Sequence, residues 1–208
     1  MEQEPHQPEG NGNDDQPAEV QPEQSPKPDP RIYVASLSDY NAGRLHGAWL
    51  SADVGYEELS EGVRTMLAAS PTPGAEEFGI FDYEGFGPLR LDEYEALSTV
   101  ATIAHGIAEH GPAYAHWAAM VGTTDLGEMS EFEDAYRGHW ESVTAYADDL
   151  LEDLGANRYI EEAIPDYLQP YVKLDVEGFA RDLELGGDIV TSDGDGGVYV
   201  FDGGPWGR

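Results

Sequence analysis

The sequence predicts an α+β fold, and three observations support this prediction. Short alternating apolar segments typical of strands lie near both ends of the chain, amphipathic helical patterns accompany them, and a nearly uncharged helical stretch lies between them. Hydrophobic residues make up 40% of the chain, which is enough for a packed core. We therefore expect a mixed N-terminal domain at residues 31–94, a helical middle domain at 95–130 and a mixed C-terminal domain at 131–208.

Residues 1–30 differ in composition from the rest of the chain. They contain seven of the fourteen prolines, eight acidic residues and one base, Lys27, with few apolar side chains. Such a segment cannot bury enough surface to offset the entropy lost on ordering. We expect it to be a disordered, acidic, proline-rich tail.

The N-terminal domain is predicted to open with two short strands. Ile32 and Val34 mark the first, residues 45–50 mark the second, and a polar turn at 41–43 joins them. The remaining predicted elements of this domain are a helix over Tyr56–Ala69, ended by the segment "SPTPG", and a third strand over Phe78–Tyr83.

Two apolar helices are predicted for the middle domain. Asp92 has the position of an N-cap, and the helix that it would start runs from Tyr94 to Ala108 almost without charge. Gly111 and Pro112 interrupt the pattern, and a second helix covers about 113–121. These helices should be buried on most sides.

The C-terminal domain is predicted to contain strands and two capped helices. Ser142 is expected to cap a helix that ends at Leu154 before Gly155, and Asp175 to cap another. The predicted segments are a strand over 132–140, the helices over 143–154 and 176–185, a loop with Pro165 and Pro170 between them, and a closing hairpin of 189–191 and 198–201 around "SDGDGG".

The charge of the chain is its most unusual property. The sequence has 42 acidic and 10 basic residues, a formal net charge of −32, and residues 31–208 keep 34 acids against 9 bases, a net −25. A protein this acidic repels nucleic acid and anionic membranes. Closely spaced carboxylates on a folded surface resemble the DNA backbone, which carries about one charge per 1.7 Å of duplex.

The segment Glu131–Gly155 concentrates this charge. On its predicted helix, Asp148, Asp149 and Glu152 lie opposite the apolar stripe, with Asp153 at the edge. Like charges four residues apart destabilise a helix, so the pattern carries a small electrostatic cost. A solvated helix face that keeps the protein soluble explains this helix equally well. The overall charge also fits a protein of a high-salt cytoplasm.

Composition and motifs exclude several function classes. The absence of cysteine excludes disulfides and thiolate chemistry, and we expect a cytoplasmic protein because neither a signal peptide nor a membrane-length apolar run is present. Asp193 and Asp195 have calcium-loop spacing without the distal Glu, and His105, His110 and His116 are too irregularly spaced for a helical metal face. We predict no catalytic residue, no metal and no cofactor.

Three separated blocks resemble the ArdA antirestriction family. They are "YVASLSDYNAGRLHGAWL" at Tyr33–Leu50, "FDYEGF" at Phe81–Phe86, and "YVKLDVEGFARDLELGGDI" with "GGVYVF" within Tyr171–Phe201. Their order and spacing follow the family from residue 31 to about residue 202. The first 30 residues and the final "GGPWGR" lie outside the resemblance, and the tail could extend the function or only aid solubility.

The resemblance implies a specific function. ArdA proteins mimic bent B-form DNA, occupy the DNA-binding groove of type I restriction-modification enzymes and let incoming mobile-element DNA escape restriction. The implied fold is an elongated three-domain α+β chain, and the implied assembly is a homodimer through the C-terminal domain. The implied partner is the methyltransferase core of the enzyme, with no nucleic acid or membrane bound.

The predicted contact surface consists of exposed acids, none of which should dominate. The candidates are Glu76, Glu77, Asp82, Glu84, Glu131, Glu133, Asp134, Asp148, Asp149, Glu152 and Asp153. Two alternatives remain open beside the DNA mimic: an acidic module that binds another basic DNA-binding protein, and an acidic hydrolase with an unrecognised site.

Overall fold

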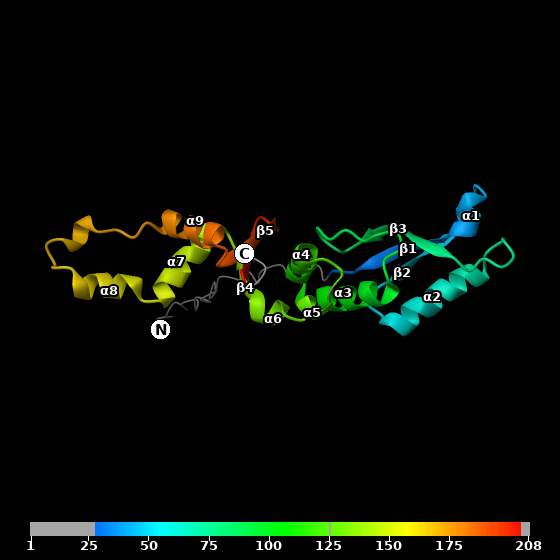
Figure 1. The fold of residues 1–208 in the computed structure, drawn as a ribbon, viewed down its shortest axis with the longest axis horizontal. Coiled ribbons are helices and arrows are strands. Elements are labelled where there is room, and N and C mark those ends of the chain that lie inside the picture. The colour runs from blue at the N-terminus through cyan, green and yellow to red at the C-terminus, as the bar shows by residue number, and fades with distance from the viewer. Residues whose placement is uncertain (1–27, 125, 205–208) are drawn as a thin grey trace, which may run out of the picture.

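A computed structural model describes residues 28–124 and 126–204, without the side chain of Leu126. The fold is a mixture of helices and strands, as predicted, drawn out along one axis with a small sheet on either side of a helical centre (Figure 1). Residues 1–27, and with them most of the predicted tail, lie outside the described residues. Pro30 is already part of the fold: it is buried, and its carbonyl accepts a 2.8 Å hydrogen bond from the Ala52 backbone N–H.

The N-terminal lobe, which we define as residues 28–95, is built on an antiparallel sheet in the order β2-β1-β3. Ile32 and Val34 of the central strand are fully buried, and Leu59, Val63 and Met66 of the long helix pack against them with helical spacing. The elements are β1 (Arg31–Ser36), α1 (Leu37–Asn41), β2 (Gly47–Ser51), α2 (Tyr56–Ala68) and β3 (Phe78–Glu84).

Most of the elements predicted for this lobe are confirmed, and one residue was misplaced. Leu45 was expected in the second strand but precedes β2 and is 74% exposed. The backbone explains this, because Arg44 N–H donates to Asp39 and Ser36 N–H donates to His46, so residues 44–46 complete the turn that leads into the strand.

The middle of the molecule contains α3 (Leu97–His110) and α4 (Pro112–Val121). Asp92 is not the N-cap that the sequence suggested. The helix begins five residues later, after Ala96, and Asp92 instead accepts a 2.9 Å hydrogen bond from Tyr94 N–H within a turn. Ile80 N–H of β3 donates to the Glu93 carbonyl at 2.8 Å, which holds this turn against the strand.

The C-terminal lobe, residues 131–204, has a second antiparallel sheet in the order β4-β6-β5. Ser142 and Asp175 cap α7 and α9 as predicted, by accepting from Ala145 N–H at 3.1 Å and Gly178 N–H at 2.9 Å. The elements that follow α4 are α5 (Leu126–Met129), α6 (Phe132–Ala135), β4 (Tyr136–Trp140), α7 (Val143–Asp153), α8 (Ala156–Ala163), η1 (Gln169–Tyr171), α9 (Val176–Gly186), β5 (Ile189–Gly194) and β6 (Gly197–Asp202).

Two predictions for this lobe were wrong in part. The expected strand over 132–140 begins as a helix, because Phe132 and Ala135 are both buried at a spacing of three residues, and the chain extends only from Tyr136. The expected loop between α7 and α9 contains α8 and η1.

Strand β6 connects two hydrophobic clusters through its alternating side chains. Tyr199 and Phe201 join the large core that also contains α3, α4 and the N-terminal sheet, while Val198 and Val200 face α7 and α9. The large core is therefore continuous from one lobe to the other. The proposed division into three domains stays a prediction.

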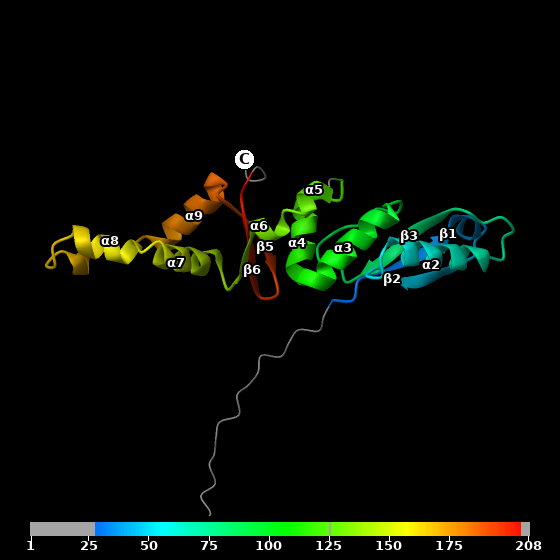
Figure 2. The same cartoon turned by 90° about the horizontal axis from the view of Figure 1, so that it is seen from below.

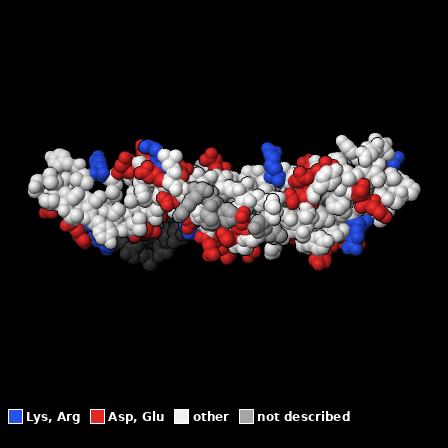
Figure 3. Space-filling model, in the orientation of Figure 1, with Lys and Arg blue, Asp and Glu red and all other residues white. Residues whose placement is uncertain are grey.

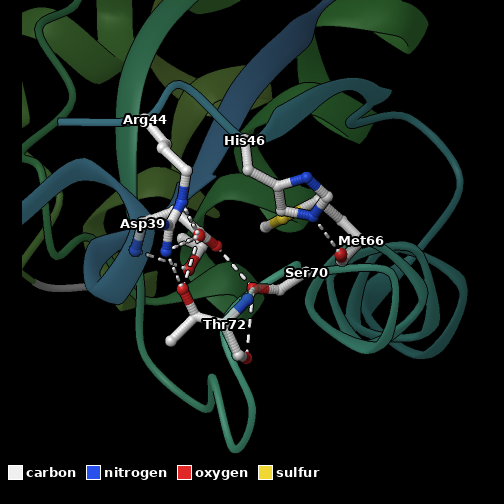
Figure 4. Close-up of polar contacts among 7 residues, drawn as sticks. Asp39, Arg44, His46, Met66, Ser70 and Thr72 are labelled. Atoms are coloured by element: carbon white, nitrogen blue, oxygen red, sulfur yellow. Dashed lines mark hydrogen bonds and ion pairs between the residues drawn. The ribbon is translucent and has the colours of Figure 1, made fainter. Parts of the chain in front are cut away.

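One carboxylate is buried in the N-terminal lobe. Asp39 of α1 has no exposed surface and accepts from the hydroxyls of Ser70 at 2.5 Å and Thr72 at 2.6 Å and from Arg44 Nε at 3.1 Å (Figure 4). The Ser70 hydroxyl, followed by Thr72, holds the pKa of Asp39 well below its usual range against the opposing effect of burial. The network ties α1 to the loop that follows α2.

We predict that Asp39→Asn lowers the melting temperature, because a buried amide cannot accept the same set of bonds. The folded-state pKa is depressed, so the carboxylate contributes its full stability above the ordinary carboxyl pKa of about 3.9 and loses it as the pH falls towards the folded value. Thermal unfolding of the wild type and of Asp39→Asn is measured between neutral and acidic pH. The difference between their melting temperatures should shrink only at the acid end. Asp82→Asn, an exposed control, should change little; a pH-independent deficit in Asp39→Asn would contradict the assignment.

Candidate functional site

Carboxylate side chains lie almost entirely at the surface of the described residues. The exceptions are the buried Asp39 and the partly buried Asp53, Glu95 and Glu128. All eleven acids that the sequence singled out are exposed. Acidic side chains occur along the whole length of the visible face, with few basic ones between them (Figure 3). The structure thus leaves these acids accessible, and their contact role stays a prediction.

The first group of candidates, Glu76, Glu77, Asp82 and Glu84, precedes or lies on β3. A β-bulge positions Asp82 and Glu84, because the pairing with β1 shifts between Tyr33 and Val34. Ile80 and Tyr83 consequently both face the core, although they are three positions apart and would lie on opposite faces of a regular strand. Asp82 and Glu84 consequently share the outer face of the sheet. An unbroken register would have placed Asp82 on the same side as Ile80.

Glu84 is the candidate least available to a partner. Its Oε2 atom accepts from Arg31 Nε at 2.8 Å and from Arg31 Nη2 at 2.5 Å, and the Arg31 guanidinium lies 5.1 Å from the Trp49 ring centroid. No local pattern could predict this pair, because the two residues are 53 positions apart. The pair removes one negative charge from the outer face of the sheet.

The structure adds Asp92 and Glu93 to the first group. The turn beside β3 brings them near Glu77, and all three carboxylates raise the pKa of the Tyr94 hydroxyl: Glu93 has the largest effect, burial follows, and Glu77 and Asp92 add to it. Sequence reasoning missed these acids because it interpreted Asp92 as the N-cap of a helix and Glu93 as part of its first turn, where acids are common.

The second group lies on α6 and α7. Phe132 and Ala135 point inward from α6, so Glu131, Glu133 and Asp134 lie at the surface. On α7, the buried Tyr146 and Ala147 face the second hydrophobic cluster. The exposed acids of α7 are Asp148, Asp149, Glu152 and Asp153. Among the described residues, no basic side chain forms an ion pair with any acid of this second group.

The two groups do not form one compact site. The β3 group lies in one lobe, the α7 group in the other, and α6 lies between them along the long axis (Figures 1 and 2). Such an arrangement suits an extended partner surface better than a small ligand.

The histidines do not assemble a metal centre in the part of the chain described here, where no cluster of three or more metal-ligating side chains occurs. His116 of α4 is buried, its Nδ1 lies 2.7 Å from Ser192 Oγ, and its ring packs 4.4 Å from that of Tyr199. Burial lowers the pKa of His116, partly offset by Asp195. This histidine therefore joins α4 to the closing hairpin. Within residues 28–124 and 126–204, no helix combines the length and apolar character needed to cross a membrane.

We predict that Asp149→Asn combined with Asp153→Asn stabilises the protein. The two carboxylates stand four residues apart near the C-terminal end of α7, where like charge and the helix dipole both oppose them. Relief of this pair should raise the free energy of unfolding by about 0.2–0.5 kcal/mol in dilute salt and by less at high salt. Urea unfolding at two salt concentrations measures the effect.

Glu177→Gln is the matched control for that experiment. Glu177 is an exposed acid in the first turn of α9, where the helix dipole favours negative charge, so its neutralisation should not stabilise the protein. Equal stabilisation by both changes would mean that overall charge, rather than the local pair on α7, sets the effect.

Two comparisons with known proteins bear on identity. A comparison with curated proteins gave no match. A comparison with family models matched residues 32–197 to the model described as Antirestriction protein (ArdA), which confirms the family that the three sequence blocks indicated. The match spans most of the chain, from β1 into the start of β6. The chain therefore belongs to the ArdA family of antirestriction proteins.

Proposed function

We propose that this protein is an acidic DNA mimic that occupies the DNA-binding groove of type I restriction-modification enzymes in the cytoplasm and so protects incoming mobile-element DNA from restriction. Membership of the ArdA family supports the antirestriction role. The observation that carries the mechanism is the distribution of exposed carboxylates over the length of an elongated fold.

The proposed mechanism is electrostatic competition. A DNA-binding groove presents lysines and arginines at positions that fit phosphates, and carboxylates held on a rigid surface can take those positions. The acids of α6 and α7 suit this role because they form no ion pairs within the described part of the chain. The mimic offers neither a scissile phosphodiester nor a base to methylate, so it needs no catalytic residue, metal or cofactor.

We further propose a homodimer formed through the C-terminal lobe. An exposed apolar patch at the end of this lobe supports it, and we call it the terminal patch: Tyr159, Tyr167, Leu168 and Tyr171. Gln169 Nε2 donates to the carbonyls of Glu161 and Ile164 at 3.1 Å, which fixes the loop of the patch against α8. Exposed aromatic side chains are typical of protein interfaces.

The first test is competition with DNA. A fluorescent duplex bound to a type I methyltransferase core should be displaced stoichiometrically by this protein, and less effectively as salt is raised. Failure to displace the duplex from several such enzymes at low salt would overturn the proposed target. Displacement of DNA from an unrelated basic DNA-binding protein instead would favour the second candidate function, an acidic module for another partner.

Single neutral substitutions are predicted to have small effects on this displacement. Exposed ion pairs contribute about 0.2–1 kcal/mol each, so one change such as Asp148→Asn should weaken binding by less than about fivefold. Neutralising Asp148, Asp149, Glu152 and Asp153 together should weaken it on the order of tens-fold. The control exchanges Asp and Glu at the same four positions and keeps the charge. A single neutral change that abolished displacement would contradict a distributed surface.

The dimer is tested at the terminal patch. Tyr167→Asp with Tyr171→Asp should raise the dimer dissociation constant by at least about tenfold, because each buried aromatic side chain contributes roughly 1.5–3 kcal/mol. Sedimentation equilibrium measures the change, and Tyr94→Asp, an exposed tyrosine of the N-terminal lobe, is the control. A wild-type protein that stays monomeric at high concentration would rule out the dimer, and an unaffected dimer would place the interface elsewhere.

A further inference from the structure

A groove lies at the waist of the molecule, where α4 and α5 meet the C-terminal sheet and α9; both ribbon views place α4 beside β5 (Figures 1 and 2). We call it the waist groove, and its volume is about 700 Å³. That volume falls within the range of ligand-binding pockets, about 300–1,000 Å³. Its lining residues are Trp117, Met120, Val121, Glu128, Glu184, Ile189, Val190 and Thr191.

The floor and walls of the waist groove are largely apolar. Trp117, Val121 and Met120 line it from α4, and Ile189 and Val190 line it from β5. Met120 is 37% exposed, so its thioether is accessible at the mouth of the groove. Flexible Met side chains at a concave surface are well suited to receive an apolar side chain of a partner.

Carboxylates accompany this apolar surface, and none of the described residues that line the groove is basic. Glu128 lines it from α5 and Glu184 from α9. The Thr191 hydroxyl donates to Glu184 Oε1 at 2.9 Å, which positions that carboxylate beside β5. The groove thus combines an apolar interior with the negative charge of Glu184, and an occupant with an apolar group and a positive charge is complementary to it.

We propose that the waist groove binds an amphipathic basic segment of the partner enzyme, with an apolar side chain inserted between α4 and β5 and a flanking lysine or arginine beside Glu184. The inference rests on the proposed function, because that function supplies a basic protein as the partner. It also goes beyond that function, because the edge of a DNA duplex offers phosphates and no comparable apolar pocket. Apolar burial in the groove would add a contribution to the binding free energy that salt does not screen.

The first experiment compares two exposed apolar residues replaced by lysine. Met120→Lys changes the mouth of the waist groove, and Leu45→Lys makes the same change of charge on an exposed residue of the N-terminal lobe. Affinity for the methyltransferase core is measured in dilute salt and at about 0.5 M salt, where exposed charges are strongly screened. We expect Met120→Lys to bind about tenfold more weakly than Leu45→Lys at both salt concentrations. Equal affinities for the two variants would overturn the proposal.

The second experiment tests the groove without the enzyme. The protein, labelled with ¹³C at its methionine methyl groups, is titrated with a short helical peptide of lysine and leucine, and separately with a peptide in which serine replaces every leucine. The Met120 resonance should shift with the leucine peptide and not with the serine peptide, while the buried Met66 serves as the internal reference. Equal responses to both peptides, or no response to either, would overturn the proposal.

The two experiments separate the groove from the general mechanism. If the wild-type protein fails to bind any type I enzyme, the proposed function fails and the peptide titration alone decides whether the groove takes an amphipathic cation. If the wild-type protein displaces DNA, and Met120→Lys and Leu45→Lys bind the methyltransferase core with equal affinity, the proposed DNA mimicry is supported and the groove proposal is wrong.

Discussion

Electrostatic self-repulsion is the constraint on which the rest of this structure depends. With 34 acids against 9 bases in residues 31–208, carboxylates cannot be gathered inside a compact body without a large cost. The chain responds by placing nearly all of them in solvent on a drawn-out fold. Three of its nine bases link elements of the fold: Arg31 joins β1 to β3, Arg44 meets Asp39, and Arg137 joins β4 to β6 through Asp202.

The apolar centre makes this arrangement possible. Helix α3 has one acidic residue, Glu109, and no Lys or Arg, and α4 has no Asp, Glu, Lys or Arg. The two helices can therefore pack closely. Gly106 shows how closely, because a Cβ at that position would overlap the Tyr114 ring. Trp117 then contacts Phe201 of the C-terminal sheet, with ring centroids 5.4 Å apart. The large hydrophobic cluster therefore runs through this region from the N-terminal sheet to the C-terminal sheet.

Local signals in the sequence predicted local structure well. The capped helices α7 and α9 could be predicted because Ser142 and Asp175 are followed by clean amphipathic patterns. The prediction of Asp92 as an N-cap was wrong because the Ile80 N–H of β3 binds the Glu93 carbonyl, a contact between distant segments that no local pattern reveals. For the candidate site, the abundance of acids made their exposure predictable. The Arg31–Glu84 pair, the bulge beneath Asp82 and the waist groove depend on tertiary packing and could not be predicted.

The packing of Trp117 against Phe201 has a kinetic consequence. Because a continuous core joins the two lobes, a partner that contacts one lobe finds the other at a fixed position, so the second contact has the high effective concentration of an intramolecular event. Release then requires both lobes to detach before either rebinds. Under the proposed function, such a molecule would remain on its partner for a long time although each individual carboxylate contact would be weak.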